Sequence, residues 1–185
     1  MKKRIKKHID AKNFVKVYLA DDEGFTLIHF EGIIFDQNEK FILMSDFEDF
    51  NYDGFVVARK SDISEIKCTN NESFFDSIIE KEGIKEVLIQ KASDLNFKLS
   101  DFPEMFNTLK ELGGAIIIER LYETDSKFQI GPVSKVEKKK VFIDYFNAMG
   151  EYDLKPVTSK YRDITYFKLD SPYANMFFKY SKRVE

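Results

Sequence analysis

The sequence predicts a mainly β protein with a few helices, of the α+β class, made of two small five-stranded units in tandem, each followed by a helix. Short apolar segments separated by polar turns recur about every ten residues across residues 30–66, which is typical of a small barrel or sandwich. A diverged copy of this stretch returns about 100 residues later. Barrel closure would also remove exposed strand edges, so we expect two small barrels.

The first copy opens with a basic segment that is either a solvated tail or the first turn of a short helix. Apolar runs and alternation then predict five strands, the last of which contains Ile63 and Ile66. Polar residues predict the turns between them, and an acidic loop precedes the fourth strand. The basic segment covers residues 1–8, and the first four strands are predicted at 14–19, 25–35, 41–44 and 55–58. The turns are predicted at 21–24 and 36–39, and the acidic loop at 46–53.

Helical periodicity follows the first set of strands. Apolar residues fall on one helical face within residues 72–82, and Gly83 stands where a C-cap glycine belongs. Residues 84–90 resemble one more strand, and 93–98 a connector or short strand. The strongest amphipathic pattern lies between Ser100 or Asp101 as N-cap and Gly113; its repeat is Phe102, Met105, Phe106, Leu109 and Leu112.

The second copy repeats this order. Strands are predicted at 115–122, 128–136 and 141–146, with a turn at 123–125, and Gly131 corresponds to Gly32 of the first copy. Ser171 and Pro172 then predict the start of a helix, as N-cap and first helical residue. We therefore expect two domains, 1–92 and 93–185, the second with a helix both before and after its strands.

Composition restricts the protein class. Nineteen Phe and nine Tyr among 185 residues can fill two small cores. Cys68 is the single cysteine, so no internal disulfide can form and a reducing compartment is expected. No apolar run is long enough to span a membrane, and no apolar run follows the basic N-terminus as it would in a secretory signal. These features predict a cytoplasmic protein with no membrane partner.

The formal net charge of −3 conceals an asymmetry between the two copies. Residues 30–82 contain five Lys and Arg against thirteen Asp and Glu, whereas residues 129–185 contain eleven against seven. The copies therefore present opposite electrostatic potentials, which bears on their partners and not on their fold.

The first copy resembles an Sm/LSm domain of the wider SH3-like barrel group over about 50 residues. The matching residues are Gly32, Asp36, the run Phe41-Ile42-Leu43, Asp46, and the segment from Gly54 to Arg59 followed by Ile63 and Ile66. The resemblance implies a small β-barrel and RNA binding.

Two departures bear on the function that the resemblance implies. Lys40 stands where Sm proteins carry an RNA-contacting Asn, and Lys60 stands where they carry Gly. In the second copy the turn Asp and the Arg-Gly signature are both absent. The resemblance therefore supports the barrel more than RNA binding.

No catalytic, cofactor or metal site is predicted. The segment from Asp49 to Gly54 begins like a calcium-binding loop, but its twelfth position is Lys60 where Glu is required, so a solvated acidic turn is expected. His8 and His29 are too few for a catalytic or metal constellation. Cys68 is expected to be a buried, inert thiol. Gly113-Gly114 follows a helix, which is the wrong order for a phosphate-binding loop.

Two charged surfaces are candidates for binding a partner. Aromatic residues among cations are typical of single-stranded nucleic-acid surfaces, although a solvated lysine-rich turn beside core tyrosines explains the same pattern. The basic candidates are Lys135, Lys138, Lys139, Lys140, Tyr145, Tyr152, Lys155, Lys160, Tyr161 and Arg162; the acidic candidates are Asp46, Glu48, Asp49 and Asp53.

We therefore expect a non-catalytic interaction protein, a tandem module that binds a protein partner. The acidic first copy suits a basic protein. The alternative is binding of RNA or single-stranded DNA through the basic second copy. Binding to a generic oligonucleotide that weakens steeply with salt would distinguish the two.

Overall fold

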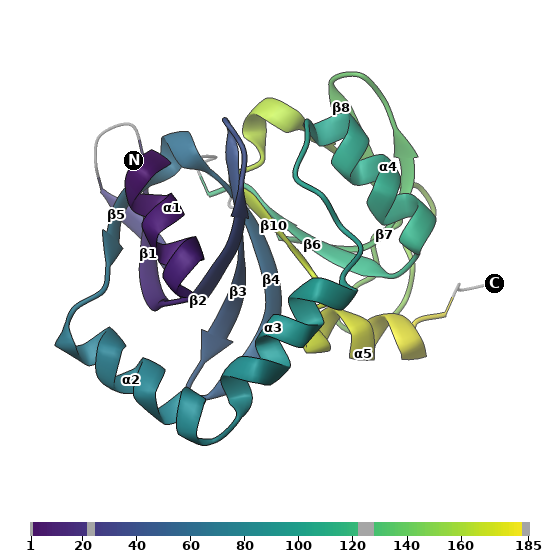
Figure 1. The fold of residues 1–185 in the computed structure, drawn as a ribbon. Coiled ribbons are helices and arrows are strands. Elements are labelled where there is room, and N and C mark those ends of the chain that lie inside the picture. Colours follow the sequence, from purple (N-terminus) through teal and green to yellow (C-terminus); the bar gives the residue numbers. More distant parts are fainter. Residues whose placement is uncertain (1, 22–24, 122–127, 183–185) are drawn as a thin grey trace. The chain divides into compact units, whose positions relative to one another are not determined.

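The computed structural model describes residues 2–21, 25–121 and 128–182, which form two compact units, Met1–Leu99 and Ser100–Glu185 (Figure 1). The described residues contain five α-helices in all and five antiparallel strands in each unit. This confirms the prediction of a mainly β chain with a few helices. The predicted boundary at residue 92 falls inside a helix.

The first unit contains a leading helix, five strands and two further helices. A single turn of 3₁₀ helix, η1, joins the last two strands. The elements are α1 (Lys2–Ala11), β1 (Phe14–Ala20), β2 (Thr26–Gln37), β3 (Phe41–Glu48), β4 (Asn51–Arg59), η1 (Lys60–Asp62), β5 (Ile63–Lys67), α2 (Asn70–Lys81) and α3 (Ile84–Asp94).

The second unit repeats this plan with one helix before its strands and one after them. Again a 3₁₀ turn, η2, stands between the fourth and fifth strands. The elements are α4 (Phe102–Leu112), β6 (Ala115–Glu119), β7 (Gln129–Val136), β8 (Lys140–Ile143), β9 (Val157–Lys160), η2 (Tyr161–Asp163), β10 (Tyr166–Leu169) and α5 (Pro172–Tyr180).

Both units have the same strand order, β5-β1-β2-β3-β4 in the first and β10-β6-β7-β8-β9 in the second. The register matches as well, because Val15 faces Gly32 in the first unit and Ile116 faces Gly131 in the second. The internal repeat read from the sequence therefore extends to strand order and pairing.

The prediction of two closed barrels does not hold. Within each unit the fourth and fifth strands stand at opposite ends of the strand order, and no pairing joins them among the described residues. A 3₁₀ turn of three residues stands between them, and after it β5 pairs with β1 and β10 pairs with β6, at the other edge of each set of strands.

Two other sequence predictions are corrected by the structure. Residues 84–90 are not a strand but lie in α3, whose Leu88 is buried. Residues 46–53 are not a loop, because β3 and β4 continue as a hairpin in which Glu48 pairs with Asn51. Asp49 and Phe50 form its tip at φ of 46° and 66°.

Side chains cap α2, α4 and α5, and the caps of α4 and α5 are the ones that the sequence predicts. Thr69 caps α2 in a reciprocal capping box with Glu72. The Asp101 carboxylate caps α4 by accepting from the Glu104 backbone N–H at 3.0 Å, and Ser171 caps α5, which begins with Pro172. These caps fix where each helix meets its strands.

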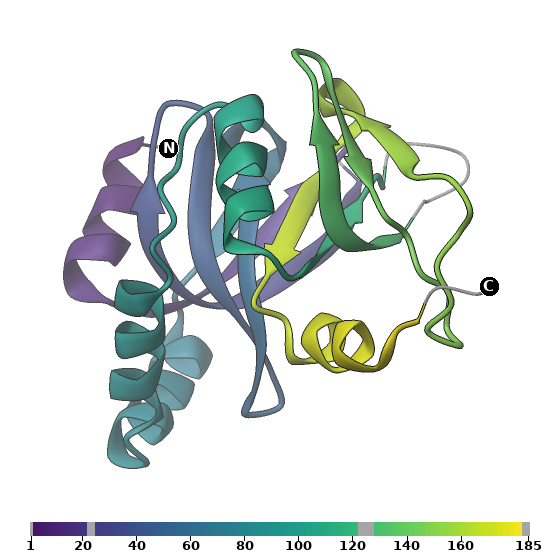
Figure 2. The same cartoon turned by 90° about the vertical axis from the view of Figure 1, so that its right-hand side faces the viewer.

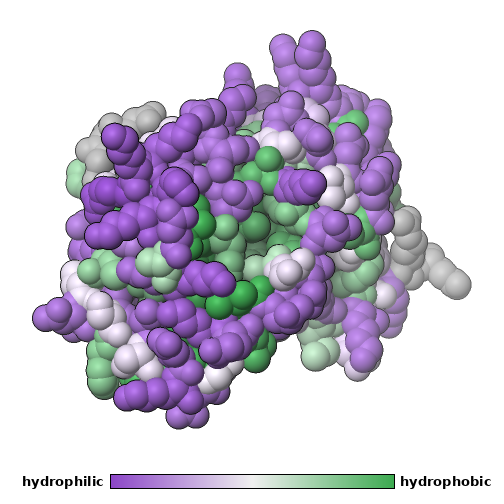
Figure 3. Space-filling view, viewed as in Figure 1, coloured by the Kyte–Doolittle hydropathy of each residue, from purple (hydrophilic) through white to green (hydrophobic). Residues whose placement is uncertain are grey.

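The basic N-terminal segment is a helix rather than a tail. Ile5 is the buried residue of α1, and its lysines face solvent. Figure 3 shows the hydrophilic surface over this helix. Of the predicted turn at 21–24 only Asp21 is described, the turn at 123–125 lies outside the described residues, and so does the last residue of the strand predicted at 115–122.

The helix after the strands completes one aromatic core in each unit. In the first unit α2 and α3 cover Phe14, Ile33 and Phe47. In the second, α5 covers Ala115 and Phe146, and Figure 2 shows this helix beneath the strands of its unit. Burying these rings contributes strongly to stability because aromatic side chains remove a large apolar area from water.

Candidate functional site

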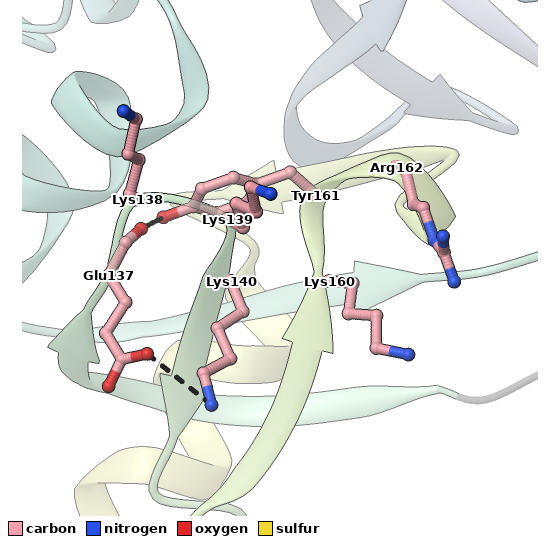
Figure 4. A pocket seen from close by; sticks show the side chains of 7 residues that line it. All are labelled: Glu137, Lys138, Lys139, Lys140, Lys160, Tyr161 and Arg162. Carbon is pink, nitrogen blue, oxygen red and sulfur yellow. Dashed lines mark hydrogen bonds and ion pairs between the residues drawn. The ribbon is translucent and has the colours of Figure 1, made fainter.

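Most of the predicted basic residues line one cavity of about 670 Å³ in the second unit. The turn between β7 and β8 forms one wall, and the end of β9 with η2 forms the other (Figure 4). We call this cavity the basic pocket. It is lined by Glu137, Lys138, Lys139, Lys140, Lys160, Tyr161 and Arg162.

Hydrogen bonds hold the two walls together. The Tyr161 backbone N–H donates to the Lys139 carbonyl at 3.1 Å, and the Tyr161 hydroxyl donates to the Glu137 carbonyl at 2.8 Å. The turn itself closes through the Glu137 N–H and the Lys140 carbonyl at 2.9 Å. The lysines of the turn therefore project from a backbone that these hydrogen bonds hold in place.

An aromatic stack from α4 supports the pocket from below. The Tyr161 ring lies nearly parallel to Phe106, at 5.8 Å and 7° between ring planes, and to Phe102, at 5.2 Å and 16°. Burial raises the pKa of Tyr161 to about 12, with smaller contributions from the charges of Asp101 and Glu137. The hydroxyl is therefore protonated at neutral pH and remains a donor.

The carboxylate of Glu137 neutralises only part of the positive charge. It forms ion pairs with Lys135 at 2.7 Å and Lys140 at 3.4 Å, and the hydrogen bond from Lys135 holds the pKa of Glu137 below its usual range. Arg162 pairs with Asp163 at 3.1 Å. Lys138, Lys139 and Lys160 form no ion pair with any described residue.

Two of the lysines face each other across the sheet. Lys140 of β8 and Lys160 of β9 are Cα partners in the antiparallel register. Like charges directly opposite destabilise a strand pair. Glu137 compensates Lys140 but not Lys160, so a bound anion would relieve a repulsion that is built into the strand register.

Tyr145 and Tyr152 lie outside this pocket. Both pack against the core cluster around Phe146, and the Tyr152 hydroxyl accepts from the Ser181 hydroxyl at 3.0 Å. Lys155 is exposed, but it does not line the pocket, whereas Lys135 joins it through Glu137. The structure therefore unites the predicted cations other than Lys155 and separates two of the three predicted tyrosines from them.

Sequence reasoning missed the aromatic support of the pocket. Phe102 and Phe106 belong to the amphipathic repeat that predicts the helix before the second copy, and in the structure they also hold Tyr161 in place. Glu137 was missed because it stands among lysines in a turn. Its position two residues after Lys135 and three before Lys140 was the available signal.

The matching place in the first unit is built differently. There the Lys60 ammonium, and not a tyrosine hydroxyl, donates to the turn carbonyl of Asn38 at 2.9 Å and also to Gln37 at 2.8 Å. Lys2 of α1 forms an ion pair with Glu39 of the same turn at 2.5 Å. Lys60 and Lys2 therefore interact with groups of their own unit.

The predicted acidic surface is only partly exposed. Asp46 is buried, and its carboxylate accepts from the Phe47 backbone N–H at 3.1 Å. Glu48 and Asp49 lie exposed at the hairpin tip, and Asp53 is half-buried. The exposed acidic surface is therefore formed mainly by Glu48 and Asp49 at the hairpin tip.

The histidines and the cysteine form no common site. His8 lies on α1, where burial lowers its pKa, and the half-exposed His29 lies 3.4 Å from Glu31. The Cys68 thiol accepts a long hydrogen bond from Asn13 at 3.6 Å. In the described part of the chain no three His, Cys, Asp or Glu side chains are grouped so as to hold a metal ion.

A second surface feature is apolar. A groove of about 210 Å³ lies between α5 and the loop before residue 151, and we call it the α5 groove. Met149 is 77% exposed and Met176 59% exposed, and the exposed Lys179 and Lys182 follow on or just after the helix. The groove is lined by Ala148, Met149, Gly150, Met176, Phe177 and Tyr180.

Comparison of the chain with protein-family models, with curated proteins and with solved structures finds no match. Of the helices in the described ranges, none has the length and apolar character needed to cross a membrane.

Proposed function

We propose that the protein is a non-catalytic binding protein whose second unit binds the backbone of RNA or single-stranded DNA at the basic pocket. The observation that carries this proposal is the grouping of five cations around one cavity with a single carboxylate among them. Phosphate groups would displace counterions from these side chains, which is the main source of affinity in such complexes.

We also propose that the two units are copies of one module related to the Sm and SH3-like type, with its sheet open. The shared strand order, the paired glycines Gly32 and Gly131 and the 3₁₀ turn before each last strand support this relationship. The copies differ in their charged turns, so we assign nucleic-acid binding to the second unit alone.

Fluorescence anisotropy with a short labelled oligo(U) tests the first proposal. At about 50 mM salt we expect binding that weakens steeply by about 200 mM. Lys138→Ser and Lys160→Ser should each lower affinity several-fold and reduce the salt slope by roughly one contact. Lys110→Ser, which removes an exposed lysine of α4, is the matched control. Absence of binding at low salt would rule the proposal out.

Binding of a protein partner at the α5 groove is the second candidate function, and the exposed methionines around the groove favour it. Large apolar side chains that face water are typical of partner surfaces. Lys179 and Lys182 stand beside the groove. A partner segment that fits the groove would therefore carry an apolar side chain next to carboxylates.

Capture of partners from the native host tests this second candidate. Met176→Asp should abolish capture of a partner that uses the groove. Val87→Asp, which changes a similarly exposed apolar residue on α3, should leave capture intact. Equal capture by both variants would exclude the groove as the binding surface.

A further inference from the structure

The aromatic rings at the basic pocket are engaged with other protein groups. Tyr161 is only 8% exposed and stacks on Phe102 and Phe106. Phe142 on β8 has the ammonium groups of Lys135 and Lys140 at 5.4 and 4.8 Å from its ring centre. A nucleic-acid base needs an accessible ring face to stack on. Tyr161 offers none, and on the half-buried Phe142 a base would compete with two lysine ammonium groups.

The exposed Phe128 stands just before β7, whereas the lysine turn follows the other end of that strand. The side-chain oxygen of its neighbour Gln129 accepts from the Ser159 hydroxyl of β9 at 2.7 Å, so Phe128 lies near β9 and not at the turn. Tyr173 and Tyr180, which are also exposed, belong to α5.

The cations of the pocket are mostly lysines, which read base edges less specifically than arginine does. Sequence-specific contacts commonly use the paired donors of an arginine. Arg162 is the arginine among the described pocket residues, and its Nε already donates to Asp163. The other cations are lysines, which act as point charges on flexible stems.

The cations do not converge on one point. In Figure 4 the Lys138 side chain points away from those of Lys140 and Lys160, and Arg162 lies on the far side of Lys160. A single small anion could contact only some of these groups. A chain of phosphates passing over the turn and β9 could contact more of them in succession.

We infer that the basic pocket recognises the charge of an extended phosphodiester chain and not its bases. This inference rests on the proposed nucleic-acid function and specifies its ligand: affinity follows the number of phosphates, and base identity contributes little.

An abasic oligonucleotide, which keeps the sugar–phosphate chain and lacks every base, tests this inference. We expect it to bind within about twofold of an oligo(dT) of equal length and to show the same salt slope, because only phosphate contacts contribute. Oligo(dA) and oligo(dC) should bind equally well. A tenfold weaker abasic probe, or a tenfold preference among the bases, would overturn the inference.

The same experiment also distinguishes failure of this inference from failure of the proposed nucleic-acid binding. If oligo(dT) binds and the abasic probe does not, base independence fails while nucleic-acid binding stands; if neither binds at low salt, both fail. Phe142→Leu offers a second measurement, because it removes the ring but leaves the lysines. Unchanged affinity for oligo(dT) would support the inference, and a tenfold loss in a folded variant would contradict it.

Discussion

Replacing Gly131 with alanine is expected to destabilise the second unit by roughly 2–6 kcal/mol, enough to remove much of the stability of a small domain. A Cβ atom at this position would lie 2.0 Å from the backbone oxygen of Asp144. That oxygen belongs to the segment just after β8, whose Asp144 N–H donates to the Pro132 carbonyl. Relief of the overlap therefore requires β7 and β8 to separate.

Two costs add at this position. Gly131 has a φ of 151°, which a residue with a side chain rarely adopts and which costs about 1–3 kcal/mol. The steric overlap with backbone, which cannot rotate away as a side chain could, costs about another 1–3 kcal/mol. The sum is the expected loss.

Gly113→Ala is the control within the same unit. Gly113 also has a positive φ, of 67°, but an added Cβ would meet nothing within 4 Å. Its φ of 67° and ψ of 157° lie in a region that is almost exclusive to glycine, so we expect it to lose about 1–3 kcal/mol from backbone strain alone. Urea unfolding followed by circular dichroism compares the two variants, and hydrogen exchange of β7 and β8 localises the effect. Equal losses would show that steric overlap is not the cause.

Gly32 occupies the same place in the first unit. A Cβ there would lie 2.2 Å from the Ser45 oxygen, in the segment that corresponds to Asp144. The sequence alone aligned these two glycines because the surrounding strand pattern recurs. It could not reveal why glycine is required, since the approaching oxygen comes from the neighbouring strand and leaves no local signal.

Helix α3 and the β3–β4 hairpin were predicted wrongly for a similar reason, because packing contacts decide their structure and leave no local signal in the sequence. Ile84 and Val87 favour a strand by propensity, but Leu88 is buried and the remaining polar residues suit a helix, so packing decided the outcome. The turn of Asp49 and Phe50 contains neither Gly nor Asn. Its strain is offset by Phe50 stacking on Phe75 at 4.3 Å, a contact distant in sequence.

The candidate site was only partly visible in the sequence. The lysine cluster could be predicted because a run of like charges in a turn must face solvent. The register that places Lys160 opposite Lys140 could not, because β9 was not located as a strand. The assignment of tyrosines to the surface failed at Tyr161 because Phe102 and Phe106 come from a helix before the repeat.

Replacing Phe106 with alanine is expected to destabilise the second unit by about 3–5 kcal/mol, because the fully buried ring leaves a cavity between α4 and the strands. The ring contacts Phe167 at 5.0 Å as well as Tyr161. Leu112→Ala on the same helix, at a half-exposed position, should change stability by no more than about 0.5 kcal/mol. Urea unfolding measures both.

The same variant should also change the titration of Tyr161. The folded chain holds this proton up to a pH of about 12, whereas the unfolded chain releases it near the ordinary value of 10.0. The stability that the neutral hydroxyl contributes is therefore complete below pH 10 and is lost as the pH rises to about 12. Phe106→Ala exposes the ring, so the pKa should fall toward 10 and this loss should shrink.

Absorbance of tyrosinate during an alkaline titration measures the shift, with Tyr161→Phe identifying the contribution of this residue among the nine tyrosines. A lowered pKa together with weaker oligonucleotide binding would show that the α4 rings set both the burial of Tyr161 and the position of the lysine turn. A pKa that stays near 12 in a destabilised Phe106→Ala variant would mean that Phe102 alone covers the ring. The turn should then keep its affinity, because the hydroxyl would still hold the Glu137 carbonyl.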